Sequence, residues 1–290
     1  AADPHTRVLA MYIESLPDGR RFIEEARKVT QYKPIVALKV GRSASGQRAA
    51  ASHTGALAGT DAAYDSAFEK AGVLRANSAE ELFEWSRALA WLPIPSGKRM
   101  AVLTNAGGPG VMSADFIEAS GLSLAEFSDA TREKLRALLP PAASLINPVD
   151  MLSSASPHEY ANSLQILLDD PNVDGVLLVL PPPPMYSTES VADSLIPLIS
   201  TSAKPVTIAL MGSNLVREAF RRFTAARIPT YDFPERAASA LSCLSRRADY
   251  LRDIQTETKP TQTLDHVKIS SILGGIKSAS WLDPEAADRL

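Results

Sequence analysis

Short apolar runs, each followed by a segment with helical spacing, restrict the fold of this chain more than any other feature. The first two runs cover residues 8–13 and 35–40, and a segment with apolar residues on one helical face, 20–30, lies between them. Runs of this length suit buried strands, and the strand-helix-strand order is typical of a βαβ unit with a parallel sheet. The sequence therefore predicts an α/β fold built on doubly wound parallel sheets.

The same alternation begins again after a stretch rich in Pro, Ser and Gly at residues 93–98. Further strands are expected at residues 100–104, 174–180 and 205–211, with a loop at 105–110 and a helix at 111–120 after the first of them. We therefore predict two flavodoxin-like domains, residues 1–96 and 97–251. The first is expected to lack its N-terminal part, because the chain starts at a late strand. Residues 252–290 are predicted to hold a polar linker, 252–262, and the start of a following region.

Composition excludes several classes of protein. The chain has 290 residues, a net charge of -3 and 45% apolar residues, which is ordinary for a globular protein and indicates no nucleic acid or membrane partner. Its single cysteine, Cys243, rules out an internal disulfide and a thiolate metal site, and we predict no metal site and a cytoplasmic location. A sheet that starts late leaves an unpaired edge, so an oligomer is expected.

His53 is the first candidate functional residue. It lies in a segment rich in Gly, Ser, Thr and Ala, residues 41–59, directly after a predicted strand. Small neighbours leave an imidazole ring uncovered, and neutral imidazole is a competent nucleophile toward phosphorus and a competent acid or base. The residues alone equally allow a loop histidine held by hydrogen bonds.

Glu14 is the second candidate, because it follows the first predicted strand and so lies at the same sheet edge as the His53 segment. A carboxylate there can accept a hydrogen bond from one imidazole nitrogen, which fixes the tautomer and leaves the other nitrogen free to attack. The alternative is a solvated carboxylate at a strand end.

A glycine-rich stretch, residues 105–110, comes before the predicted helix of the second domain. Free N–H groups at a helix N-terminus bind anions, although the stretch lacks the Lys-Ser/Thr of a P-loop and Pro109 breaks a dinucleotide fingerprint. A tight strand-helix turn explains the glycines equally well. Residues 147–150, Asn-Pro-Val-Asp, are interpreted as a turn with a helix N-cap.

Residues 51–59, Ala-Ser-His-Thr-Gly-Ala-Leu-Ala-Gly, closely resemble the phosphohistidine motif of ADP-forming acetyl-CoA synthetases, which are relatives of succinyl-CoA synthetase. Residues 12–15 resemble the family segment whose Glu stabilises the phosphohistidine, and residues 104–111 and 147–150 resemble markers of the next domain. These motifs occur in the family's order, and the resemblance extends to about Leu251.

The resemblance implies an NDP-forming acyl-CoA synthetase in which an acyl phosphate phosphorylates His53 and the phosphohistidine then phosphorylates ADP. Glu14 would stabilise the phosphohistidine, and helix N-termini would offset its charge, the second of them after Pro184. Phosphate-binding residues are then expected at Gly55, Asn105, Gly107, Gly108 and Gly110.

No tightly bound cofactor is implied. The substrates would be acyl-CoA, a carboxylic acid, CoA, ATP or ADP, and phosphate, with Mg²⁺ on the nucleotide in an ATP-grasp domain. That domain and a CoA-binding domain would lie in the same or a partner chain. Two alternatives remain open: a regulatory synthetase-like module of a protein acetyltransferase, and a ligand-binding α/β module without a covalent step.

Overall fold

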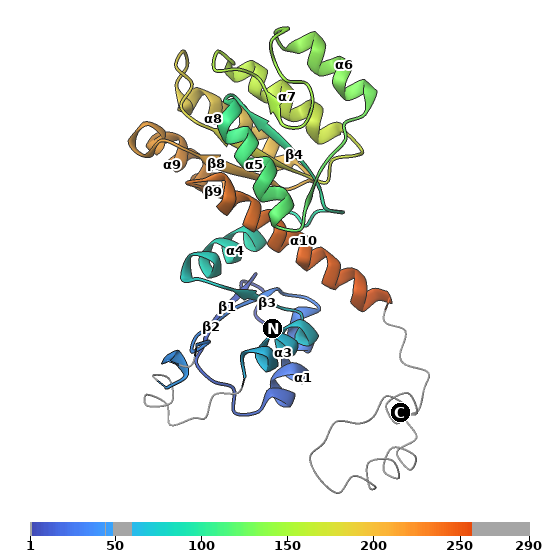
Figure 1. Ribbon diagram of the computed structural model, residues 1–290, viewed down its shortest axis with the longest axis vertical. Helices are drawn as coiled ribbons and strands as arrows, with labels where there is room; N and C mark the ends of the chain where they lie inside the picture. The colour runs from blue at the N-terminus through green and yellow to red at the C-terminus, as the bar shows by residue number, and fades with distance from the viewer. Residues whose placement is uncertain (1, 44, 49–59, 257–290) are drawn as a thin grey trace, which may run out of the picture. The chain divides into compact units, whose positions relative to one another are not determined.

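The computed structural model describes residues 2–43, 45–48 and 60–256 (Figure 1). The chain divides into two compact units, Ala1–Leu251 and Arg252–Leu290, and both β-sheets belong to the first unit. Within the described residues, no helix is both long enough and apolar enough to cross a membrane.

The first sheet has three parallel strands in the order β1-β2-β3. Helices α1 and α3 pack on one face of this sheet, and α4 packs on the other. Because both faces are covered, the strands are largely apolar, with Lys39 in β2 and Arg75 in β3 as charged exceptions. The bounds are β1 Leu9–Ile13, α1 Gly19–Thr30, β2 Ile35–Lys39, α3 Asp61–Ala71, β3 Val73–Ala76 and α4 Ala79–Trp91.

The second sheet has six parallel strands, in the order β5-β4-β7-β8-β9, with β6 paired to β4. Helices α6 to α9 pack on one face, and α5 and α10 pack on the other. The strands are β4 Arg99–Thr104, β5 Ser123–Leu124, β6 Val149–Asp150, β7 Gly175–Leu180, β8 Val206–Leu210 and β9 Thr230–Tyr231. The helices are α5 Gly107–Ala119, α6 Asp129–Leu138, α7 Pro157–Asp169, α8 Thr188–Thr201, η1 Ser213–Val216, α9 Arg217–Ala225 and α10 Pro234–Thr256.

Helix α10 contributes to the cores of both sheets (Figure 1). Leu241 and Leu244 pack on the second sheet, while the fully buried Cys243 packs on the first. Farther along, the Tyr250 hydroxyl lies 2.8 Å from Thr30 Oγ1, at the end of α1. The two sheets are therefore joined by a shared helix as well as by the chain between them.

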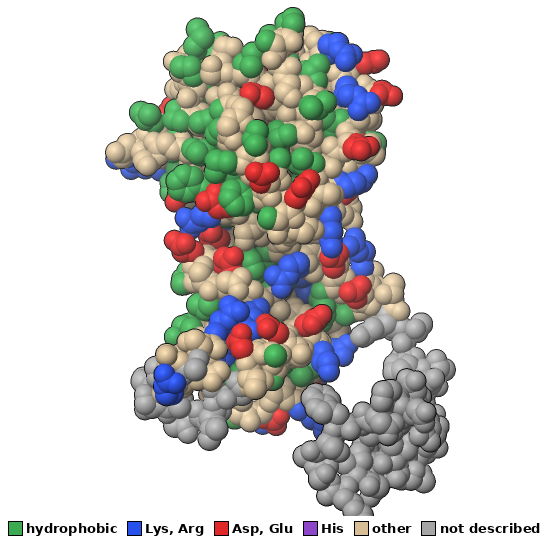
Figure 2. Space-filling model, in the orientation of Figure 1, with side chains coloured by type: hydrophobic (Ala, Val, Ile, Leu, Met, Phe, Trp, Pro, Cys, Tyr) green, Lys and Arg blue, Asp and Glu red, His purple; other side chains and the backbone are tan. Residues whose placement is uncertain are grey.

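Helix α4 is the second element that both sheets share. Its Trp85 belongs to the first core and its Ala88 to the second, and Trp85 Nε1 donates to Ser239 Oγ of α10 at 2.9 Å. An ion pair of 2.7 Å between Arg236 Nη2 and Glu84 Oε1 also joins the two helices. On the face shown in Figure 2, acidic and basic side chains lie near one another at the level of α4.

Helix α3 ends at Gly72, which has φ +67°, in the left-handed region that glycine adopts without strain. A Cβ atom at this position would overlap the ring of Tyr250 from α10. Gly72 therefore serves both the backbone geometry and the packing of the shared helix.

The α/β class with doubly wound parallel sheets is confirmed, but the predicted start of α5 is wrong. The sequence places residues 105–110 in a loop, whereas the helix already begins at Gly107. Pro109 is compatible with this, because N–H groups in the first turn of a helix have no intrahelical acceptor and Pro lacks only that group. Helix α10 also continues to Thr256, through the first part of the predicted linker.

Candidate functional site

The carboxyl ends of the first sheet's strands meet at one edge. Ile13 at the end of β1 pairs with Lys39 at the end of β2, and Glu14 follows directly after β1. Glu14 is partly buried there, at the edge where the sequence places it. His53 and Gly55 lie outside the described residues.

Lys39 is a buried cation at this edge, and the sequence analysis did not identify it. Only 2% of the residue is exposed, its Nζ donates to the Val40 carbonyl, and the same nitrogen lies 4.4 Å from the centroid of the Tyr64 ring. Burial lowers the pKa of Lys39 below its usual value, and the nearby charge of Arg75 lowers it further, while Asp61 and Glu14 act in the opposite direction. A lysine in an otherwise apolar strand is the sequence signal that could have revealed it.

Arg75 is a second buried cation, and it lies within β3. It is 8% exposed and forms ion pairs with Asp61 and Asp65 on the first turns of α3. Burial alone would lower the pKa of Arg75, but the hydrogen bonds and charges of the two aspartates outweigh it and raise that pKa. Burial likewise acts to raise the pKa of Asp61, but Arg75 and Arg42 reverse the effect and lower it.

Arg42 extends this ion-pair network across the edge. Its Nε lies 3.3 Å from Asp61 Oδ2, and its Nη1 donates to Asn77 Oδ1 at 3.0 Å. Asn77 in turn donates through its backbone N–H to Glu81 Oε2 of α4 at 2.7 Å. The ends of β2 and β3, the start of α3 and the start of α4 are thus tied together by side chains.

The carboxyl edge of the second sheet at the end of β4 is built differently, with glycines at the start of the following helix. Helix α5 begins there, and its N-cap residue, Ala106, makes no side-chain capping bond. Asn105 is 3% exposed, and its Oδ1 has no hydrogen-bond partner among the described residues. A Cβ atom at Gly108 would meet nothing within 4 Å. This helix N-terminus can accept an anion on its backbone N–H groups.

The other two glycines of α5 have close neighbours. A Cβ atom at Gly107 would lie 3.3 Å from Asp150 Oδ2, and one at Gly110 would lie 3.0 Å from Thr104 Cγ2. The Gly110 N–H already donates to the Ala106 carbonyl at 3.2 Å. Gly110 therefore permits close packing of the turn against β4, while the first turn of the helix lies beside a carboxylate.

The interpretation of residues 147–150 as a turn with an N-cap is wrong for Asn147. Its Oδ1 accepts from the Val102 N–H at 2.9 Å, and its Nδ2 donates to the carbonyls of Met100 at 2.8 Å and Ala125 at 3.1 Å. The side chain therefore satisfies backbone groups of β4 between its short partners β5 and β6. Buried backbone polar groups require such partners, which explains the asparagine.

Helix α8, which follows Pro184, differs from α5 at its N-terminus. Its N-cap residue Ser187 accepts a hydrogen bond from the Ser190 N–H at 3.2 Å. The N–H of Ser190 is thus satisfied by a side chain. Of these two helices, α5 is the one that lacks a side-chain cap and so offers the more open N-terminus for an anion.

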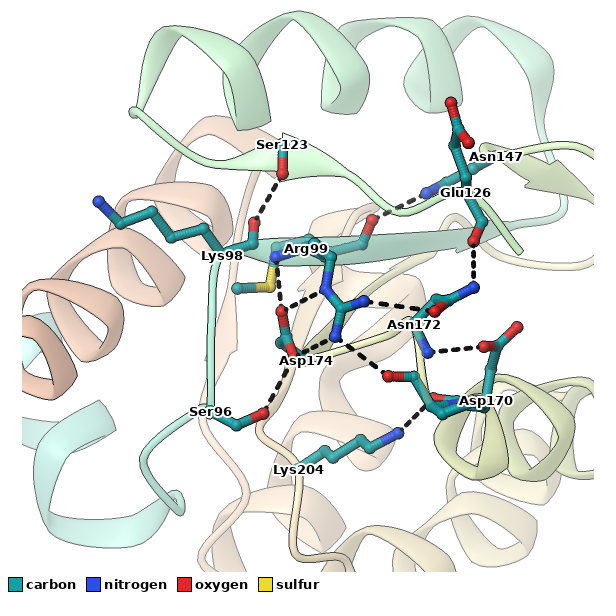
Figure 3. A network of polar contacts seen from close by, with 12 residues as sticks. Ser96, Lys98, Arg99, Ser123, Glu126, Asn147, Asp170, Asn172, Asp174 and Lys204 are labelled. Atoms are coloured by element: carbon teal, nitrogen blue, oxygen red, sulfur yellow. Dashed lines mark hydrogen bonds and ion pairs between the residues drawn. The ribbon is translucent and has the colours of Figure 1, made fainter. Parts of the chain in front are cut away.

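A further charged network lies at the opposite, amino edge of the second sheet (Figure 3). Asp174, 3% exposed, accepts from the Arg99 N–H and Nε at 3.0 Å each and from Ser96 Oγ at 2.9 Å. Lys204 Nζ donates to the carbonyl of Asp170 at 2.6 Å. Because the active edges of doubly wound sheets are the carboxyl ones, this network serves to hold the fold.

Comparison with known proteins covers most of the chain. Residues 1–89 match the model of the succinyl-CoA ligase like flavodoxin domain, and residues 100–253 match that of the Ligase-CoA domain. The alpha subunit of ADP-forming acetate–CoA ligase II from Pyrococcus furiosus is 44% identical over 83% of this chain. ADP-forming acetate–CoA ligase I from Archaeoglobus fulgidus is 42% identical over 85%.

A solved structure agrees with these matches. The dinucleotide forming acetyl-coenzyme A synthetase 1 of Ca. Korarchaeum cryptofilum, in complex with phosphate and ADP, superposes with a TM-score of 0.81 at 38% identity over 87% of this chain. The chain spans 54% of the Pyrococcus subunit, 35% of the Archaeoglobus protein and 56% of the Korarchaeum chain.

Proposed function

Since the chain belongs to the Ligase-CoA domain family, we propose that it is part of an NDP-forming acyl-CoA synthetase. In this proposal the whole enzyme interconverts acyl-CoA, ADP and phosphate with a carboxylic acid, CoA and ATP. The observation that carries the proposal is the match of two family domains in sequence, with His53 in the resembling motif between β2 and α3. Residues 1–96 form the phosphohistidine domain, residues 97–251 the second domain, and residues 252–290 lead to a following region.

The chemical step assigned to this chain is phosphoryl transfer through His53. A ring nitrogen attacks the phosphorus of an acyl phosphate, a P–N bond forms, and the P–O bond to the acyl group breaks. The electron pair of that bond leaves with the carboxylate. In the second transfer a terminal oxygen of ADP attacks the same phosphorus, the P–N bond breaks and the nitrogen regains its lone pair. A histidine between two phosphate carriers is a nucleophile of the kind that splits one transfer into two.

Glu14 is assigned the role of orienting the imidazole. Its place at the end of β1 supports this, because the carboxyl ends of parallel strands meet at one edge and the His53 segment begins from the neighbouring strand β2. A carboxylate that accepts from one ring nitrogen keeps the proton there and leaves the other nitrogen free. A charge-assisted hydrogen bond of this kind contributes about 1.5–3 kcal/mol.

Phosphate is assigned to the N-terminus of α5 together with Gly55. The uncapped first turn at Gly107 and Gly108 and the unpaired amide oxygen of Asn105 support this assignment. Since the N and O atoms of an amide can be exchanged by a half-turn of the side chain, Asn105 can present its Nδ2 to an anion. Gly110 supports the site through close packing of the turn.

The remaining substrates are assigned to other parts of the enzyme. CoA and the nucleotide with its Mg²⁺ bind CoA-binding and ATP-grasp domains in the same or a partner chain, in the cytoplasm, and no tightly bound cofactor is needed. No group of three or more His, Cys, Asp or Glu residues in the described part of the chain is arranged to hold a metal ion.

The test uses the full-length protein with its nucleotide-binding partner and radiolabelled ATP. The expected result is protein-bound phosphate that is labile in acid and stable in base, and that disappears in His53→Ala together with ATP formation from acetyl-CoA, ADP and phosphate. Equal labelling of the wild type and His53→Ala, or an acid-stable label, would overturn the phosphohistidine mechanism. The regulatory-module and ligand-binding alternatives would then take its place.

A further inference from the structure

The two ends of the segment that carries His53 are joined by an ion pair. Arg42 lies just beyond β2 and Asp61 is the first residue of α3, so the two residues flank residues 43–60. Arg42 Nε lies 3.3 Å from Asp61 Oδ2. The segment therefore leaves the sheet and returns to it at points that are fixed to each other.

Asp61 is also fixed to the sheet itself. Arg75, within β3, pairs with Asp61 and with Asp65, and its Nη1 also donates to the Asp61 carbonyl at 3.4 Å. The guanidinium carbon of Arg75 lies 5.9 Å from the centroid of the Phe68 ring, one turn farther along α3. A buried guanidinium with two carboxylates and an aromatic neighbour has little freedom, so the start of α3 is held to strand β3.

Arg42 is held on its other side by Asn77, which follows β3. Asn77 Nδ2 and N–H both donate to Glu81 Oε2, at 3.1 and 2.7 Å, and Glu81 lies in the first turn of α4. Arg42 thus connects the start of α3 with the start of α4, both of which pack on the first sheet.

An isolated ion pair at a surface contributes little, because solvent screens it and long side chains lose freedom. The pair of Arg42 and Asp61 is not isolated, since Asp61 is already held by the buried Arg75. Because Asp61 is already fixed, only Arg42 loses side-chain freedom when the pair forms, which lowers the total entropy cost. Geometric fixation of a reacting group is worth large factors in rate, and a displacement of about 1 Å can lower a rate a hundredfold.

We propose that Arg42, Asp61 and Arg75 form a clasp that fixes both ends of the segment bearing His53 and so positions it for phosphoryl transfer. The inference rests on the proposed function and adds three positioning residues to it. None of the three exchanges a proton or a phosphoryl group in this role.

The clasp is tested in the full-length enzyme with its nucleotide-binding partner, by the rate of His53 labelling from radiolabelled ATP. Arg42→Gln and Asp61→Asn are expected to lower the maximal labelling rate about tenfold and to leave the ATP concentration at half-maximal rate unchanged. Arg42→Lys keeps the charge and is expected to restore part of the rate. A purely structural role would not give this separation or this rescue.

The matched control is Arg99→Gln, which breaks the ion pair with Asp174 at the far edge of the second sheet. It is expected to lower the melting temperature without changing the labelling rate of the folded enzyme. Unchanged labelling in Arg42→Gln, which removes a half-exposed side chain and keeps the fold, overturns the clasp, as does an equal loss in Arg99→Gln. If the wild type shows no His53-dependent label, the proposed function fails and the clasp fails with it.

Discussion

The two sheets share a topology of parallel strands covered by helices, yet their charged networks lie at opposite edges. In the first sheet, Lys39, Arg75 and Asp61 gather at the carboxyl edge, where Glu14 also lies. In the second, the half-exposed Arg99 pairs with the buried Asp174 at the amino edge, and the carboxyl edge at the end of β4 is built from glycines and an amide.

The two edges illustrate two ways in which a protein can position or bind a charged group. Side chains with full charges can position a reacting group, but they need partners that neutralise them when the site is empty. Backbone N–H groups at a helix N-terminus carry only partial charges and are already arranged by the helix. On the proposed function, the first edge orients the nucleophile and the second receives the phosphate.

Asp174→Asn is the strongest test of the difference between the two charged networks, because it should affect stability alone. The amide weakens the charge-assisted hydrogen bonds that the buried Asp174 accepts, while the half-exposed Arg99 remains solvated, so the free energy of unfolding is expected to fall by about 1.5–3 kcal/mol. His53 labelling per folded molecule should not change. Urea denaturation followed by circular dichroism measures the free energy of unfolding. A His53 labelling rate clearly below that of the wild type would contradict a purely structural role of the Arg99–Asp174 network.

The same variant carries a pH signature. Burial acts to raise the pKa of Asp174, but the hydrogen bonds from Arg99 and Ser96 outweigh it and lower the pKa below its usual value. A carboxyl whose pKa is lower in the folded state adds stability above its unfolded pKa and loses it as the pH falls through the folded value. The wild type should therefore lose more stability than Asp174→Asn between pH 5 and about pH 2. If the free energies of unfolding of the wild type and Asp174→Asn fall in parallel with pH, the network has no electrostatic role in stability.

Glu14→Gln tests the carboxyl edge of the first sheet. The amide keeps the size of the side chain but not the charge, so the fold should persist while phosphohistidine falls roughly ten- to a hundredfold. The amount of acid-labile label at equilibrium, with melting temperature as the control, measures this. A variant that accumulates as much label as the wild type would remove Glu14 from the proposed site.

Asn105→Ala tests the edge built from backbone. Because the Asn105 Oδ1 has no partner among the described residues, its removal should change the free energy of unfolding by less than about 1 kcal/mol. The phosphate concentration needed for half-maximal ATP formation should rise about fivefold, the loss of one hydrogen bond. If stability falls instead and phosphate dependence is unchanged, Asn105 serves the fold.

The smallest effect concerns the outer strands. The second sheet ends in β5 and β9, each of two residues, whereas the first ends in β1, with five residues and Tyr12 62% exposed. A longer apolar edge favours strand pairing between copies, and a charge there opposes it. Tyr12→Lys is expected to lower the apparent mass in light scattering at high concentration, while the same change at the exposed Tyr32 of the α1–β2 loop should not.

The sequence predicted the parts of the fold that depend on local pattern. The buried strands β2 and β7 both follow from runs of neighbouring apolar residues. Strands of two residues are too short to show a period, and β5, β6 and β9 were therefore missed.

The candidate site was less predictable, for a physical reason. Glu14 and the glycines of α5 could be identified because they follow a strand directly. Lys39 and Arg75 were missed. A charged residue in an apolar strand is a signal in itself, but the partners that stabilise these two cations come from α3 and are not visible in the strand sequences. Asn147 accepts a hydrogen bond from the Val102 N–H of β4, 45 residues away in the sequence, and no local sequence pattern indicates such a contact.

Helix α10 has a consequence for the order in which the molecule is made. The first sheet is synthesised early. Cys243, which packs in its core, and Tyr250, which covers Gly72, are synthesised only after all strands of the second sheet. Ser239 follows its partner Trp85 by 154 residues, roughly 8–30 s of synthesis at about 5–20 residues per second. During that interval one apolar face of the first sheet lacks the contacts that α10 supplies in the folded molecule.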